Sequence, residues 1–221
     1  MFALAEISTS PMPSLFDLLK SGGPVMWPLL ACSLFAVAYT FERALALRRK
    51  RLGTDELGRR VVDAARSSGA NGARTVLAGD ASALSRILAH ALNLESARAD
   101  EREKRVEDFA TNEVKRLSWN LKPLLLVYIV APLFGLLGTV WGLILCFATI
   151  ATQNGLGRAD LLASGVYQAL VTTAAGLAIA IPTLVVYTHF KNRIERFARS
   201  TEEIYRDLDA ALVAPRPALE A

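Results

Sequence analysis

Residues 121–152 and 161–190 are two long apolar stretches of the chain. Four of the polar side chains inside them are Thr139, Gln168, Thr172 and Thr173. A threonine hydroxyl donates one hydrogen bond and accepts others, and an amide does both, but neither group titrates near neutral pH. Such groups can line an ion path or hydrogen-bond to a titrating acid, but they cannot relay a proton by titration. Neither apolar stretch contains an acid, so a second chain would have to supply one.

Two stripes of small and polar residues carry these side chains when the stretches are drawn on helical wheels. One stripe comprises Tyr128, Ala131, Pro132, Gly135, Gly138, Thr139, Gly142, Cys146, Thr149 and Gln153, opposite Leu126, Leu133, Leu137, Val140, Ile144 and Phe147. The other comprises Gly165, Gln168, Ala169, Thr172, Thr173, Gly176, Ala180 and Thr183, opposite Leu170, Val171, Leu177, Ile181 and Val185. A turn of about eight residues joins the stretches, so we expect an antiparallel pair with facing stripes.

Packing is the simpler interpretation of most of these residues. Small residues let membrane helices approach closely, and we assign this role to Gly135, Gly138, Gly142, Gly176 and Pro182. A threonine in a helix often bonds its own carbonyl four residues back, without any further role. The crowding of hydroxyls and one amide onto both stripes nevertheless favours a weakly polar lining.

The elements that must position these groups are three apolar segments, residues 25–47, 121–152 and 161–190. Each exceeds the roughly 20 helical residues that cross a bilayer. Mean hydropathy is +0.32, with 52% hydrophobic residues, which argues against a simple globular enzyme. The isolated His90 and His189 predict no catalytic or metal site, we expect no cofactor, and Cys32 and Cys146 lie in apolar runs.

Lysine and arginine counts predict the orientation. Of the 25 such residues, 17 lie from Arg43 to Lys122 and six follow residue 190. One of the other two precedes the first span, and one lies between the second and third spans. Positive residues stay cytoplasmic, so the N-terminus is expected outside and the C-terminus inside. We read the cluster Arg48, Arg49, Lys50 and Arg51 as a topology anchor on anionic lipid rather than a nucleic-acid site.

The remaining segments are expected to be helical, and they complete an all-α membrane protein with a cytoplasmic helical bundle. The small and polar residues at 67–72 predict a turn, and residues 81–94 predict a helix. The charged run from residue 95 predicts a helix that continues into the second span. Residues 191–212 should extend the third span likewise. The expected divisions are 1–24 (periplasmic amphipathic helix), 25–47, 48–120 (cytoplasmic domain), 121–152, 153–160 (periplasmic turn), 161–190 and 191–221 (cytoplasmic helix and tail).

Two motifs resemble the ExbB/TolQ/MotA proton-channel family. Residues 135–142 (GLLGTVWG) followed by Phe147 resemble the family's second-span signature. Residues 169–177 (ALVTTAAGL), then 180–182 (AIP) and Tyr187, resemble the third, and Glu42-Arg43 also fits. The resemblance covers nearly the whole chain, and the three-span plan is similar to ExbB and TolQ rather than to four-span MotA.

The resemblance implies a pentamer around a pore that holds a single-span partner of the ExbD/TolR kind. The partner's membrane aspartate would carry the proton, and a TonB- or TolA-like transducer would pass work to the outer membrane from this inner-membrane complex. Thr139 and Thr173 match the family's pore-facing threonines, and Gln168 and Thr172 neighbour them.

One position departs from the family pattern. Gln168 stands where many members have a glutamate five residues before the second threonine. Either the partner's aspartate suffices, or this chain conducts weakly, uses another ion or does not conduct. The leading hypothesis is a stator subunit of a proton-driven energy-transducing complex, and the alternative is a non-conducting scaffold that assembles and stabilises the partner.

Overall fold

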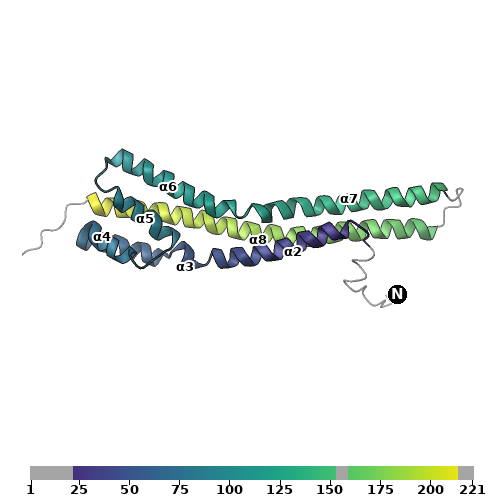
Figure 1. Cartoon of the computed structure of the whole chain (residues 1–221), viewed down its shortest axis with the longest axis horizontal. Helices are drawn as coiled ribbons and strands as arrows, with labels where there is room; N and C mark the ends of the chain where they lie inside the picture. The colour runs from purple at the N-terminus through teal and green to yellow at the C-terminus, as the bar shows by residue number, and fades with distance from the viewer. Residues whose placement is uncertain (1–21, 153–158, 214–221) are drawn as a thin grey trace, which may run out of the picture. The chain divides into compact units, whose positions relative to one another are not determined.

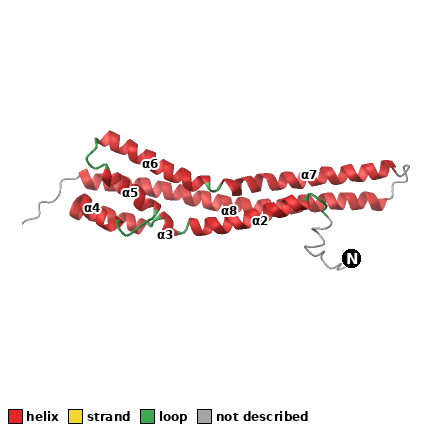
Figure 2. Cartoon of the chain, viewed as in Figure 1, coloured by secondary structure: helices red, strands yellow, loops and turns green. Residues whose placement is uncertain are grey.

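The computed structural model describes residues 22–152 and 159–213 of the chain. These residues form helices α2 to α8 and contain no strand (Figures 1 and 2), which confirms the all-helical prediction for this part. The bounds are α2 Met26–Ala46, α3 Arg49–Leu52, α4 Asp55–Leu77, α5 Ala83–Asn93, α6 Ala99–Trp119, α7 Lys122–Thr152 and α8 Ala159–Val213. The amphipathic helix expected in residues 1–24 and most of the turn 153–160 lie outside the described residues.

Three helices are long and apolar enough to cross a membrane, as the sequence predicted. The first is α2, with 21 residues, and the second and third are the apolar stretches of α7 and α8. At 1.5 Å per residue α2 is about 30 Å long, which matches the hydrocarbon core of a bilayer. The described part of the chain is therefore that of a membrane protein.

Two compact units divide the chain. The apolar unit comprises the chain up to Val37 together with Leu124–Leu184. Its centre is a cluster in which Met26 and Leu29 of α2 pack with Ala131 of α7 and Ala180 of α8. All four residues are at most 7% exposed, so each of the three helices buries one face against the other two.

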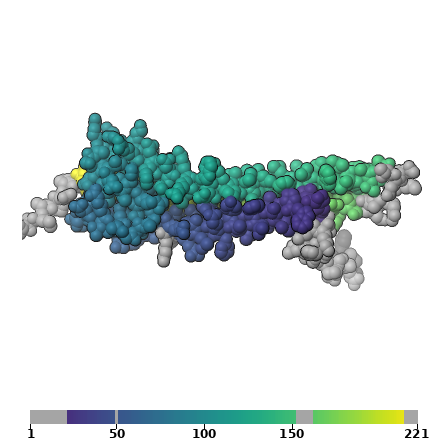
Figure 3. Space-filling view, in the orientation of Figure 1, coloured from purple at the N-terminus to yellow at the C-terminus, as the bar shows by residue number. Residues whose placement is uncertain are grey.

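The charged unit comprises Ala38–Pro123 and Val185–Ala221. Its core joins α4, α5 and the C-terminal half of α8 through Val61, Leu88, Leu92 and Leu208, and in Figure 3 the atoms of α4 to α6 (blue to teal) lie in close contact. A kink interrupts α4 at Gly69, where φ is 68° and ψ is −162°. The turn predicted for residues 67–72 is thus present as a kink within one helix.

The predicted continuous helix from the charged run into the second span is wrong. Helix α6 ends at Trp119, and α7 begins at Lys122 after a two-residue turn. Pro123 explains the break, because proline has no N–H to donate and its ring clashes with the carbonyl four residues earlier. The corresponding prediction for the third span is confirmed, because α8 continues unbroken through 55 residues.

The kink at Gly69 should depend on glycine. Its backbone lies in a region that only glycine occupies readily, so Gly69→Ala should lower the free energy of unfolding by about 1–3 kcal/mol. Thermal melting of the purified full chain in detergent, followed by circular dichroism, measures the change. A Cβ at Gly79 meets nothing within 4 Å, so Gly79→Ala is the matched control and should change stability little. Equal melting temperatures for all three proteins would contradict this account of the kink.

Candidate functional site

Close contact between α7 and α8 forms the frame of the site (Figure 1). A Cβ atom on Gly135 would lie 3.1 Å from the Cα of Thr173, and one on Gly176 would lie 2.7 Å from the carbonyl oxygen of Ala131. A Cβ on Gly138 would meet the Thr172 side chain at 2.5 Å. The two backbones therefore approach within a distance that only glycine permits at these positions.

The outer faces of both helices are apolar. On α7 the six residues opposite the polar stripe are all at least 49% exposed: Leu126, Leu133, Leu137, Val140, Ile144 and Phe147. On α8, Leu170, Leu177, Ile181 and Val185 are likewise exposed, and Val171 is half-buried. These exposures confirm the division of both helical wheels and leave the apolar faces to lipid or to other chains.

Thr172 lies entirely inside this helix pair. Its side chain has no exposed surface, and its hydroxyl donates to the carbonyl oxygen of Ala169 at 2.8 Å. The space that Gly138 leaves by lacking a Cβ is the space that Thr172 fills. A hydroxyl sealed within one chain has no surface with which to line a pore, so the structure assigns Thr172 to packing.

Thr139 and Thr173 lie at the edge of the contact and are half-buried. The Thr139 hydroxyl donates to the carbonyl oxygen of Leu136 at 2.6 Å, within α7. The Thr173 hydroxyl donates across to the carbonyl oxygen of Gly135 at 3.2 Å, one helical turn before Thr139. Both donors are thus engaged, while the lone pairs of both hydroxyl oxygens stay available to an incoming donor.

Gln168 is half-buried on α8, next to the glycine pair that leads into α2. A Cβ on Gly23 would lie 2.3 Å from Nε2 of Gln168, and one on Gly22 would lie 3.3 Å from Cγ2 of Thr172. Gly23 also has a φ of +68°, which glycine adopts readily. The sequence did not predict this contact, because Gly23 and Gln168 lie about 145 residues apart in the chain.

The remaining predicted residues are placed as follows. Gly142 lies against Ala169, where a Cβ would make an ordinary 3.4 Å contact. Pro182 is exposed on α8. Of the predicted anchors, Arg48 and Arg51 are exposed beside or within the short helix α3, which also holds Arg49 and Lys50.

The chemistry available at this site is neutral hydrogen bonding. Within the described parts of α7 and of the α8 span no acid occurs, and the charged or basic side chains, Lys122 and His189, lie at the ends of these segments. Across residues 22–152 and 159–213, no cluster of three or more potential metal ligands is found. The hydroxyls of Thr139 and Thr173 and the amide of Gln168 can accept hydrogen bonds from a protonated acid, but none of these groups changes charge near neutral pH.

Comparison with known proteins gives the family. The model of the MotA/TolQ/ExbB proton channel family matches residues 80–203, which is more than half of the chain. The chain belongs to this family. The match includes α7 and all of the α8 span, so the α7–α8 contact described above lies within the family domain of this MotA/TolQ/ExbB member.

Relatives carry both ExbB and TolQ names. The chain is 35% identical to the biopolymer transport protein ExbB-like 1 of Synechocystis sp. over 177 residues, which cover 79% of this chain and 70% of that protein. It is 31% identical to ExbB-like 3 of the same organism, over 83% of this chain and 88% of the other. It is also 38% identical to the Tol-Pal system protein TolQ of Pseudomonas aeruginosa, over 38% and 36% of the two chains.

The close contact at Gly138 predicts that an added methyl group lowers the stability of the protein at this position but not at Gly142. Gly138→Ala should force α7 and α8 apart, because its Cβ would overlap Thr172, and overpacking of this kind costs about 1–3 kcal/mol. Gly142→Ala is the matched control on the same face, since its Cβ would find normal contact distances. Melting of each purified variant in detergent tests the pair. Equal stability of the two variants would show that the contact is looser than described.

Proposed function

We propose that this chain is the pore-forming stator subunit of an energy-transducing complex driven by the proton motive force, of the ExbB or TolQ type. One observation carries the proposal: two half-buried hydroxyls, on Thr139 and Thr173, occupy the edge of a helix pair whose outer faces are largely apolar and whose described spans contain no acid. Polar groups at membrane depth are expensive and usually functional. The family match supports the same conclusion.

The partner in this proposal is a single-span protein of the ExbD/TolR kind with an aspartate in its span. When protonated, that aspartate donates to the free lone pairs of Thr139. When ionised, it needs a donor, so the Thr139 hydroxyl must release the carbonyl of Leu136 and turn toward the carboxylate. Exchanging one hydrogen bond for another costs little net free energy, about 1 kcal/mol, which suits a site that must cycle.

Several copies of this chain, a pentamer in our proposal, would surround that partner and place Thr139, Thr173 and Gln168 toward the pore. The complex would lie in the inner membrane with its N-terminus periplasmic, with 48–120 and 191–221 cytoplasmic, and would serve a TonB- or TolA-like transducer. The charge distribution supports this orientation, because 17 of 25 basic residues lie between Arg43 and Lys122.

A non-conducting scaffold is the alternative, and Gln168 is the observation that favours it. An amide at this position cannot titrate, and its side chain lies against the backbone of Gly23. In that case the chain would assemble and stabilise the partner without passing protons.

Proton flux separates the two functions. The chain, co-purified with its partner and reconstituted in liposomes, should conduct protons, and flux should vanish when the partner's membrane aspartate is changed to asparagine. An assembled complex without aspartate-dependent flux would instead support the scaffold.

The two edge hydroxyls should matter for flux but not for assembly. Thr139→Val and Thr173→Val keep the side-chain volume and remove the hydroxyl, so we expect at least a tenfold loss of flux with the complex intact by size-exclusion chromatography. Thr183→Val is the control, because Thr183 is buried on α8 and donates only to the carbonyl of Ile179 at 2.7 Å. Full flux in both edge variants would remove the pore-lining assignment.

Gln168→Glu tests whether this position meets the pore. A carboxylate at a site open to water is tolerated, whereas burial in a dry membrane contact costs about 2.5–3.5 kcal/mol or more. We expect the Gln168→Glu complex to assemble, with flux retained. Thr172→Asp is the comparison variant, because it places an acid in a contact that is closed to water. It should prevent assembly of the complex. Loss of the complex in both variants would place Gln168 in dry packing.

A further inference from the structure

A charged cleft of about 870 Å³ lies within the charged unit, where α2 ends. We call it the arginine cleft. Its walls come from the end of α2, the Gly53-Thr54 loop, the start of α5 and the end of α6. Four arginines line it, against three carboxylates: Arg43, Arg51, Arg86 and Arg116, with Glu42, Asp80 and Glu113.

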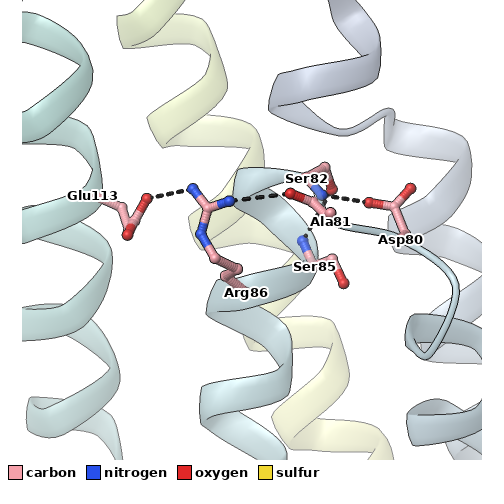
Figure 4. A network of polar contacts seen from close by, with 6 residues as sticks. All are labelled: Asp80, Ala81, Ser82, Ser85, Arg86 and Glu113. Carbon is pink, nitrogen blue, oxygen red and sulfur yellow. Dashed lines mark hydrogen bonds and ion pairs between the residues drawn. The ribbon is translucent and has the colours of Figure 1, made fainter.

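All three carboxylates already have partners. Glu113 accepts from Arg86 at 2.7 Å, and Arg86 also donates to the carbonyl of Ala81 at 3.0 Å (Figure 4). Asp80 accepts the backbone N–H of Ser82 at 2.7 Å, and Glu42 pairs with the guanidinium of Arg43. The acids therefore fix the walls of the cleft rather than neutralising its remaining cations.

The helix terminus in the cleft is satisfied as well. The Ser82 hydroxyl caps α5 by accepting the N–H of Ser85 at 3.2 Å (Figure 4). Gly53, with a φ of +103°, brings its loop against this cap, since a Cβ there would lie 3.0 Å from the Ser82 hydroxyl oxygen. The arginines are therefore the charged groups of the cleft that can attract an anion.

Two arginines of the cleft have no ion-pair partner among the described residues, and a third, Arg43, is only partly satisfied. The side chain of Arg43 is only 6% exposed, and its Nε is buried without a hydrogen-bond partner among the described residues. Arg51 and Arg116 are exposed and form no ion pair within residues 22–152 and 159–213. The exposed guanidinium groups of Arg51 and Arg116 can therefore donate to an anion in the cleft.

An adjoining hollow indicates the source of that anion. This hollow, of about 380 Å³, shares Glu42, Arg43 and Asn120 with the arginine cleft, and Tyr39, Trp119 and Lys122 also line it. Trp119 is 66% exposed, and the Lys122 ammonium lies 3.1 Å from the centre of its ring. Tryptophan, tyrosine and lysine beside the end of an apolar helix are typical of the headgroup region of a membrane.

We propose that the arginine cleft binds the phosphate of an anionic phospholipid headgroup, with Arg51 and Arg116 as its donors and Arg43 in its wall. Guanidinium groups match phosphate oxygens in charge and geometry. The acyl chains would leave past Trp119 and Tyr39. This inference depends on the membrane location of the chain and not on proton conduction, so the failure of one proposal leaves the other standing.

Native mass spectrometry of the delipidated full chain in detergent tests the inference. The protein is titrated separately with dioleoylphosphatidylglycerol, with dioleoylphosphatidylcholine and with inorganic phosphate. The test variant is Arg51→Gln with Arg116→Gln, and Arg43 is left intact because it is packed. The control is Arg60→Gln with Arg66→Gln, which removes the same charge from two exposed arginines of α4 that line neither hollow.

We expect saturable binding of phosphatidylglycerol that weakens at least tenfold in the test variant and less than twofold in the control, at equal melting temperature. Phosphatidylcholine should bind no better than background. Equal weakening in both double variants would reduce the effect to general surface charge and overturn the site. Inorganic phosphate that binds as tightly as phosphatidylglycerol, with the same dependence on Arg51 and Arg116, would overturn the assignment to lipid.

Discussion

The close approach of α7 and α8 at Gly135, Gly138 and Gly176 is the constraint on which the apolar unit depends. In lipid, apolar side chains gain little from meeting one another, so helices associate where small residues allow close backbone contact. At these glycines a Cβ would collide with the opposite helix. The contact therefore sets which residues are sealed, which stand at its edge and which face outward.

A neutral site follows from this arrangement. Thr139 and Thr173 remain at the edge with their donors engaged and their lone pairs available. Hydroxyls cost far less at membrane depth than a carboxylate does. A chain built this way offers hydrogen-bonding surface without a charge of its own, which is why the proposed stator needs the titrating acid of another protein.

The charged unit is organised by different interactions. Its core is a cluster of leucines and valines, and Arg102 of α6 reaches Asp209 of α8 at 2.7 Å and the carbonyl of Glu95 at 3.3 Å. Near the end of α2, Glu42 pairs with Arg43 and Glu113 with Arg86, while Arg51 and Arg116 form no ion pair within the described residues. Ion pairs here hold the helices in position, and the arginines without a partner give this unit the cleft on which the lipid proposal rests.

Local pattern was enough to predict the three spans and their polar and apolar faces, because length and helical period are properties of a short stretch of chain. The break at Asn120 and Leu121 was also encoded locally, by Pro123, although the charge pattern favoured an unbroken helix.

The difference between Thr172 and Thr173 was not encoded in this way. They are neighbours on one stripe, and only the approach of Gly138 and Gly135 seals one and leaves the other at the edge. The contact of Gln168 with Gly23, and the gathering of Arg43, Arg51 and Arg116, likewise join segments far apart in sequence. Such contacts depend on how whole helices pack, so tertiary structure alone decided them.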